Sequence, residues 1–140
     1  MTPYNKIRDR FLSKIDDNSL LSLPEEELNI HCDELLHSAI AQFIHCYSDL
    51  SLRNSEERFF LSTLTELEIE ILASYMVINW LNPKLQSEKL MDQSLGNRDY
   101  QLTSQANHLV ALKTLLETHQ QNVTNLIADY YYSDYERENE

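Results

Sequence analysis

Apolar residues recur at steps of three and four along most of this chain, which is the spacing of helices that bury one face. Pro24 and the three glutamates after it are typical of a helix N-terminus, and the apolar positions that follow predict a helix over 24–47. Residues 65–68 form a capping box and predict a second helix over 65–82. This helix is apolar on nearly every face, so we expect it at the centre of a bundle, with an end or a sharp kink at Pro83.

The two ends of the chain carry the other strong helical patterns. Thr2 followed by Pro3 is typical of a helix start, so residues 1–17 are predicted to form a basic N-terminal helix. Apolar positions then alternate three and four apart over 103–132 and predict a long helix that packs lengthwise on its neighbours. The positions of this seam are Leu109, Leu112, Leu116, His119, Val123, Leu126 and Tyr130. The acidic tail at 133–140 is expected to be frayed or dependent on a partner.

Residues 48–64 are the least helical part and predict an irregular loop or a short hairpin. Two adjacent phenylalanines, Phe59 and Phe60, give this segment an apolar cluster. A long loop with such residues is uncommon in a small domain unless it covers the core or docks on a partner, and both alternatives remain open. A further turn is expected at Gly96 and Asn97, before the last helix.

The composition agrees with the helical pattern. The chain has 140 residues, one glycine and three prolines, which is enough chain for one domain and too few turn residues for an all-β fold. We therefore predict an all-α fold, a single helical domain over 1–140 with a long C-terminal helix. A charged N-terminus without an apolar signal segment, and the lack of a bilayer-length apolar run, predict a protein kept in the cytoplasm where it is made, without a membrane partner.

The formal net charge of −12 disfavours binding to nucleic-acid phosphates. The charge is uneven, because the first helix carries Lys6, Arg8, Arg10 and Lys14, mostly off its apolar stripe, while the C-terminus is acidic. Ends of opposite sign suit ordered contacts between subunits, and the four basic residues are candidate interface residues. The simpler alternative is two solvated helix ends.

Candidate chemistry is sparse. Cys32 and Cys46 lie 14 residues apart in one predicted helix, too far for a disulfide, and are expected on a shared face as small apolar thiols. The histidines lack the short spacings of a metal site, and a single glycine excludes a phosphate-binding loop. Glu66 and Glu70 are interpreted as a solvated face and Glu68 as a cap. We expect no enzyme activity, no cofactor and no metal.

Two polar features remain as candidates for contacts. His119 lies on the C-terminal seam, where it is expected to be a satisfied structural histidine whose protonation could tune the contact. The C-terminal tyrosines are the second feature, because tyrosine suits surfaces that are part apolar and part hydrated. Intramolecular packing and subunit contact are equally open for this group, which comprises Tyr130, Tyr131, Tyr132 and Tyr135.

Three segments in order carry a family resemblance. They are 36–43 (LHSAIAQF) leading into Asp49-Leu50-Ser51, then 64–83 (LTELEIEILASYMVINWLNP), and then 99–109 (DYQLTSQANHL). With the long last helix ending in tyrosines, they resemble the small helical neck proteins of tailed bacteriophages, also called head-tail connector or head-completion proteins. The similarity spans 29–132. It lies in the general residue pattern of the segments and in their order, and it includes no catalytic signature.

The resemblance implies a structural virion protein, made in the host cytoplasm and located in the neck. Its expected partners are further copies of itself in a ring, the portal protein, and tail or other neck proteins. Genomic DNA would pass through the ring without sequence-specific binding. The net charge supports an alternative from another class, a small acidic phage regulator or inhibitor that mimics DNA and binds a basic host protein.

Overall fold

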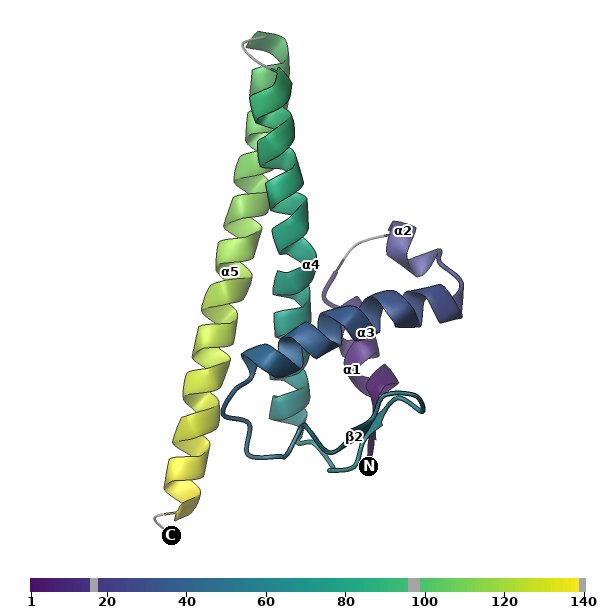
Figure 1. The fold of residues 1–140 in the computed structure, drawn as a ribbon. Helices are drawn as coiled ribbons and strands as arrows, with labels where there is room; N and C mark the ends of the chain where they lie inside the picture. Colours follow the sequence, from purple (N-terminus) through teal and green to yellow (C-terminus); the bar gives the residue numbers. More distant parts are fainter. Residues whose placement is uncertain (16–17, 96–98, 139–140) are drawn as a thin grey trace.

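The computed structural model of the chain describes residues 1–15, 18–95 and 99–138 (Figure 1). In chain order the elements are β1 (Thr2–Pro3), α1 (Tyr4–Leu12), α2 (Asn18–Leu21), α3 (Glu25–Gln42), β2 (Arg53–Asn54), β3 (Phe59–Phe60), α4 (Glu66–Leu95) and α5 (Asp99–Glu138). The turn expected at Gly96 and Asn97 lies outside the described residues.

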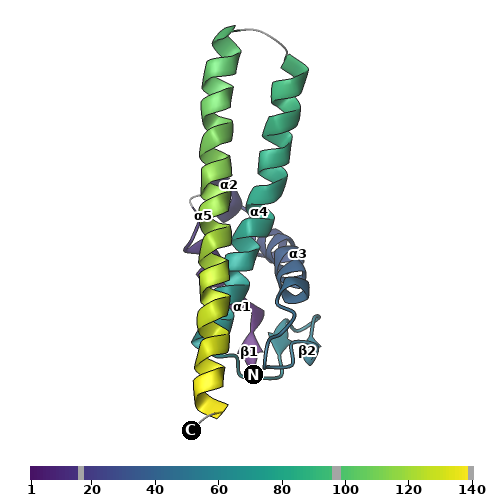
Figure 2. The same cartoon turned by 90° about the vertical axis from the view of Figure 1, so that its left-hand side faces the viewer.

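α4 and α5 lie side by side and antiparallel, and together they form a helical hairpin that projects far beyond the other elements (Figures 1 and 2). α1 and α3 pack against the N-terminal half of α4, and both chain ends lie at this base. We call the projecting part, residues 86–95 and 99–115, the arm. α5 lies on one side of α4, whereas α2 and α3 lie on the other (Figures 1 and 2).

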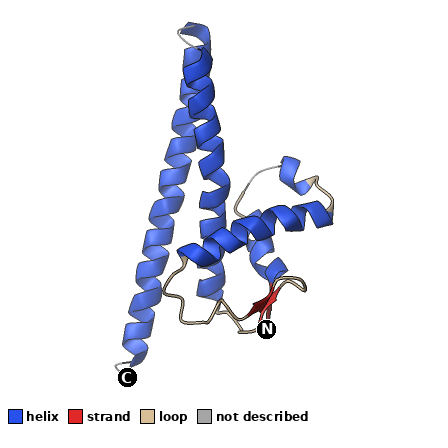
Figure 3. Cartoon of the chain, viewed as in Figure 1, coloured by secondary structure: helices blue, strands red, loops and turns tan. Residues whose placement is uncertain are grey.

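A small sheet closes the base, and the rest of the fold is helical, which confirms the all-α prediction (Figure 3). β3 is the middle strand and pairs antiparallel with β1 and β2, so that Phe60 stands between Thr2 and Arg53. The hairpin alternative for 48–64 is thus confirmed, with β1 as an additional strand. The prediction that Thr2 caps the first helix is wrong, because its hydroxyl donates to the Ser62 carbonyl at 3.0 Å and accepts the Leu64 amide at 2.9 Å.

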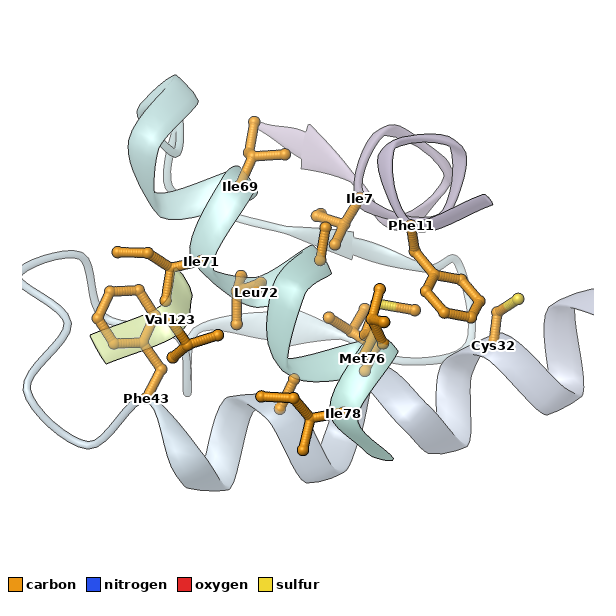
Figure 4. Packing of buried hydrophobic residues seen from close by; sticks show 14 of the residues in the cluster. Ile7, Phe11, Cys32, Phe43, Ile69, Ile71, Leu72, Met76, Ile78 and Val123 are labelled. Atoms are coloured by element: carbon orange, nitrogen blue, oxygen red, sulfur yellow. The ribbon is translucent and has the colours of Figure 1, made fainter. Parts of the chain in front are cut away.

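The core surrounds α4, as its apolar sequence predicts. Ile69, Ile71 and Leu72 are fully buried, because α4 is covered by α1, α3 and α5. Figure 4 shows side chains from all four helices meeting around it. The helix is apolar all round because it has neighbours on every side.

α4 continues through Pro83, where an end or a sharp kink was predicted. Proline removes one backbone donor, so the carbonyl of Asn79 has no partner four residues on. Leu81 and Leu85 are nevertheless buried, and this packing on both sides of the proline holds the helix together. The tertiary contacts of α4 therefore outweigh the free-energy cost of a proline inside the helix.

The limits of three further helices differ from the predictions. α1 ends at Leu12 and α3 at Gln42, before the predicted ends at 17 and 47. α3 stops early because Phe43 leaves the helical conformation (φ −87°, ψ 67°) and its buried ring packs edge-on against Tyr130 at 5.3 Å. α5 exceeds the predicted 103–132 at both ends and remains helical into the predicted tail, as far as Glu138.

Arg58 fixes the turn that leads into β3. Its φ of 63° lies in the left-handed region that a non-glycine residue occupies at a cost. Its guanidinium donates to both carboxylate oxygens of Asp33 at 2.7 and 2.8 Å and to Asn5 Oδ1 at 2.5 Å. The hydrogen bonds to Asp33 also raise the pKa of Arg58. Arg58 therefore ties the β2–β3 hairpin to α3 through Asp33 and to α1 through Asn5.

Arg58→Ala is expected to lower the free energy of unfolding by about 2 kcal/mol, since it removes a two-pronged, mostly buried ion pair and keeps the unfavourable φ. Arg58→Gly should be about 1 kcal/mol more stable than Arg58→Ala, because glycine adopts a positive φ freely. Urea denaturation of the two variants checks both values. Equal stability of the two variants would show that the backbone conformation costs nothing here.

Candidate functional site

The basic residues of the first helix, predicted as interface candidates, bind acidic groups within the chain. Lys6 Nζ lies 3.5 Å from Glu66, and Arg10 contacts Glu66 at 2.5 Å and Glu70 at 3.3 Å. Lys14 pairs with the other oxygen of Glu70. Glu66 and Glu70 were interpreted as a solvated face. Glu66 is exposed, with 67% of its side chain accessible, whereas Glu70 is only 27% exposed, because α1 packs across the start of α4 and cations reach both carboxylates.

Arg8 is bound in the same way on the other side of α1. It contacts Asp9 at 2.9 Å, Glu25 at 3.6 Å and the side-chain oxygen of Asn29 at 2.6 Å. The hydrogen bond from Arg10 is the largest cause that lowers the pKa of Glu66. The cations of the N-terminal helix are therefore paired with an equal number of carboxylates of the chain, and the net charge of −12 is carried by the other acidic residues.

Glu68 is the centre of a buried polar cluster at the base, which we call the Glu68 cluster. The predicted capping box is confirmed, since Thr65 Oγ1 accepts the Glu68 amide at 3.1 Å and Glu68 Oε1 accepts the Thr65 amide at 2.9 Å. The same carboxylate also accepts Ser48 Oγ at 2.9 Å, the Ser48 amide at 3.3 Å, Cys46 Sγ at 3.0 Å and Tyr130 OH at 2.8 Å. The residue is 1% exposed.

Hydrogen bonding decides the charge state of this cluster. Burial alone would raise the pKa of Glu68, but hydrogen bonds from Cys46, Thr65, Tyr130 and Ser48 outweigh it and lower the pKa to about 2. Burial raises the pKa of Cys46 to about 12, and burial likewise raises the pKa of Tyr130. At neutral pH the cluster is a carboxylate held by a thiol and a phenol.

The Glu68 cluster joins parts of the chain that are far apart in sequence. Ser48 comes from the loop after α3, Glu68 from α4 and Tyr130 from α5, and the Tyr130 hydroxyl also accepts the Tyr47 amide at 2.9 Å. A cavity of about 340 Å³ opens beside them. A thiol with so high a pKa is a poor nucleophile at neutral pH, so the arrangement acts as a structural clasp that fixes α5 to the base.

The two cysteines are free thiols, as predicted, but Cys46 lies beyond the end of α3 and does not share a helix face with Cys32. Burial raises the pKa of Cys32 to about 11. We expect both to react with iodoacetamide at pH 7.5 at least about tenfold more slowly in the folded than in the urea-unfolded chain, because the thiolate is the reactive form. Mass spectrometry over time measures this; a fast-reacting Cys46 would contradict the buried hydrogen bond to Glu68.

The aromatic candidates divide between core and surface. Phe60 and Phe59 were candidate interface residues, with core cover and docking both left open. Phe60 is fully buried, which decides in favour of core cover for this residue, whereas Phe59 is half-buried. Tyr130 is buried and stacks on Tyr47 with ring centroids 4.9 Å apart. Tyr131 is half-buried and meets His45 and Tyr47 edge-on, and Tyr132 is 63% exposed. The side chain of Tyr135 lies outside the description.

His119 lies half-buried on the predicted seam of α5. It lines a small cavity of about 270 Å³ that Lys14, Glu70 and Asn122 also line. Burial, followed by the nearby charge of Lys14, lowers its pKa from the usual 6.5. The imidazole is therefore neutral at pH 7, in keeping with a structural position.

The described residues provide neither a metal-binding group nor a membrane-spanning helix. In the ranges that the structure describes, His, Cys, Asp and Glu side chains form no group of three or more that could hold a metal ion. Within the same ranges, none of the helices is long and apolar enough to cross a bilayer.

The Glu68 cluster was missed by the sequence analysis, which assigned Glu68 only to the cap. No local spacing connects Glu68 with Ser48 or Tyr130, which are 20 and 62 residues away in the sequence. The one available signal was a tyrosine placed on a mostly apolar seam, since a buried hydroxyl needs a partner.

Comparison with known proteins gives no match for this chain among protein-family models, curated proteins or solved structures.

Proposed function

We propose that this chain is a structural subunit of the tailed-phage neck, in which copies assemble side by side into a ring. The ring would join the portal protein to the tail or to other neck proteins and extend the channel for the genome. The sequence resemblance to small helical neck proteins is the origin of this proposal. The geometry adds an independent reason, which is the arm.

The single observation that carries the proposal is the long two-helix arm, which projects beyond α1, α3 and the sheet (Figures 1 and 2). α5 is 40 residues long, about 60 Å at 1.5 Å per residue, and its extended contact is with α4 alone. Isolated helices draw most of their stability from tertiary packing of an apolar face. In the arm Val110 is 62% exposed and Leu115 is 44% exposed, so surfaces suited to further helix packing are open.

The charges fit a channel component. The chain carries twelve more acidic than basic side chains, and the cations of the N-terminal helix are already paired with its carboxylates. An acidic channel wall keeps DNA from adhering during its passage, because like charges oppose binding. Sequence-specific contacts with the genome are not needed for this role.

The same charge observation supports a second candidate, the acidic regulator that binds a basic host protein. The basic N-terminal helix argued against a DNA mimic, and its cations are paired within the chain. The arm remains unexplained under this alternative, because a monomeric inhibitor has no need of a long two-helix projection.

Quantitative mass spectrometry of purified phage particles separates the two candidates. We expect the chain in virions at a fixed ratio to the portal protein, with the same ratio in particles purified by two independent methods. A non-structural phage protein serves as the control for carry-over. Absence from virions, together with abundance in infected cells, would refute the neck proposal and favour the regulator.

A further inference from the structure

The outward side of α5 carries almost no charge. Between residues 107 and 128 only Lys113 and Glu117 are charged, and they lie four residues apart on one side of the helix. The remaining side, which we call the uncharged face, is exposed throughout. It consists of Asn107, Val110, Ala111, Thr114, Leu115, Thr118, Gln121, Asn122 and Asn125. The last two, Asn122 and Asn125, also line the cavity beside His119.

The uncharged face has the spacing of a second packing seam. Six of its residues, from Asn107 to Asn125, follow one another at alternate steps of four and three, like the apolar seam that packs on α4. They are Asn107, Ala111, Thr114, Thr118, Gln121 and Asn125. A helix with two such seams is suited to a neighbour on each of two sides, and among the described elements α4 is the one in extended contact with α5.

Several polar groups on the uncharged face already have partners within α5. Thr118 Oγ1 donates to the Thr114 carbonyl at 2.9 Å, and Gln121 Nε2 donates to Asn125 Oδ1 at 3.1 Å. Burying a polar group that keeps its hydrogen bond costs much less than burying one that loses it. A protein surface can therefore cover this face at a small desolvation cost.

An apolar groove lies on the opposite side of the molecule, where α2 and α3 meet α4 (Figure 1). Its volume is about 440 Å³, and its lining includes Leu20, Leu23, Leu35, Trp80 and Pro83. Leu21, next to the groove residue Leu20, is 54% exposed. The groove can accept apolar side chains of moderate size.

The groove and the uncharged face lie at the same height along the hairpin. Ser74 of α4 and Asn122 of α5 line one cavity and are therefore level. In an antiparallel pair, six residues forward along α4 correspond to six residues back along α5. Trp80 is thus level with Leu116, beside Leu115 of the uncharged face.

We propose that the uncharged face of α5 packs into the α2–α3–α4 groove of a second copy of this chain, with Leu115, at one edge of the face, as its apolar anchor. This inference rests on the proposed ring and specifies its lateral contact. Because the two surfaces differ and lie on opposite sides of the chain, each copy contacts the next one head to tail. Because the groove and the uncharged face lie at the same height along the hairpin, such contacts can close into a ring whose axis is parallel to the hairpin. Each copy has a net charge of −12, so an uncharged face is where two copies approach with least repulsion.

Cysteine cross-linking tests this contact in the full-length chain. Leu21→Cys and Leu115→Cys place thiols beside the groove and on the uncharged face, and a short bismaleimide should join them between copies into a ladder of dimers, trimers and larger species. Each single variant should give no ladder, and a mixture of the two should stop at dimers. The wild-type chain is the background control, because Cys32 is buried and Cys46 has a raised pKa.

The matched control combines Leu21→Cys with Glu117→Cys, since Glu117 is exposed at the opposite edge of the uncharged face, about 160° around α5 from Leu115, and should give a much weaker ladder. Efficient dimers of Leu115→Cys alone would show α5 packing on α5 and overturn the proposal. A Glu117 ladder equal to the Leu115 ladder, or no ladder at the highest soluble concentration, would overturn it as well.

Trp80, the only tryptophan, reports on the groove directly. Quenching of its fluorescence by acrylamide should fall as the concentration of the wild-type chain rises. In Leu115→Glu the same fall should require a protein concentration at least about tenfold higher, whereas Glu117→Gln should behave like the wild type. No change in quenching for the wild type would count against an occupied groove. If the chain forms the ladder but is absent from virions, this contact stands and the neck proposal is refuted. If the chain is present in virions but forms no ladder, the neck proposal stands and this contact is refuted.

Discussion

Replacing Glu68 with Gln is expected to lower the free energy of unfolding by roughly 3 kcal/mol at pH 7. The folded chain holds this carboxylate at a pKa of about 2 against an ordinary value of 4.5, and each unit corresponds to about 1.4 kcal/mol of preference for the charged form. Glutamine keeps the size of the side chain but removes that charge. It also turns an NH₂ group toward donors such as Cys46 and Tyr130, which then lack an acceptor.

The effect has a signature in its pH dependence. Because the folded pKa lies below the unfolded one, the stabilisation by Glu68 is fully present above about pH 4.5 and is lost as the pH falls toward 2. The wild-type chain should therefore lose stability over this range, and Glu68→Gln should lose markedly less. Urea denaturation at pH 7 and at pH 3 measures both.

Glu34→Gln is the matched control, because Glu34 is an exposed carboxylate on α3. It should unfold much like the wild type at both pH values. If Glu68→Gln kept the acid sensitivity of the wild type, the hydrogen bonds around Glu68 could not be the source of that sensitivity, and the clasp interpretation would fail.

The elements that the sequence predicted well are those whose signals are local. The helix over 24–47 and the start of α4 follow from periodicity and a capping box, which act within a few residues. The all-α class and the packing of α5 along α4 follow in the same way. These features can be predicted without knowing which segment packs against each helix in the folded chain.

The errors occur where distant segments meet. Pro83 is tolerated because Leu81 and Leu85 are buried on either side of it, which no local rule can anticipate. The basic residues of α1 were correctly placed off its apolar stripe, but their partners Glu66 and Glu70 come from a helix more than fifty residues away. Thr2 resembled a cap because local sequence does not reveal that β3 pairs with it.

The candidate interaction surface was the least predictable feature. Residues 107–125 looked unremarkable in sequence, since an uncharged exposed face becomes informative only once α4 is known to cover the other side. The groove likewise combines three helices separated by up to sixty residues. Both surfaces are products of the tertiary fold.

Phe60→Ala is expected to destabilise the chain by about 3 to 5 kcal/mol, the usual cost of removing a buried phenylalanine and leaving a cavity. Phe60 is fully buried in the middle strand, and its ring lies 5.0 Å from that of Tyr4. The loss is a large part of the 5 to 15 kcal/mol that holds a typical domain. Thermal or urea unfolding followed by far-ultraviolet circular dichroism measures it.

Leu61→Ala provides the comparison, because Leu61 directly follows β3 and is 52% exposed. Its stability should stay within about 0.5 kcal/mol of the wild type. The pair of variants thus separates the two roles first considered for the aromatic segment, cover of the core by Phe60 and an exposed apolar side chain at Leu61. If Leu61→Ala destabilised the chain as much as Phe60→Ala, Leu61 would have to contribute to the core as well, and it would not remain exposed for a partner.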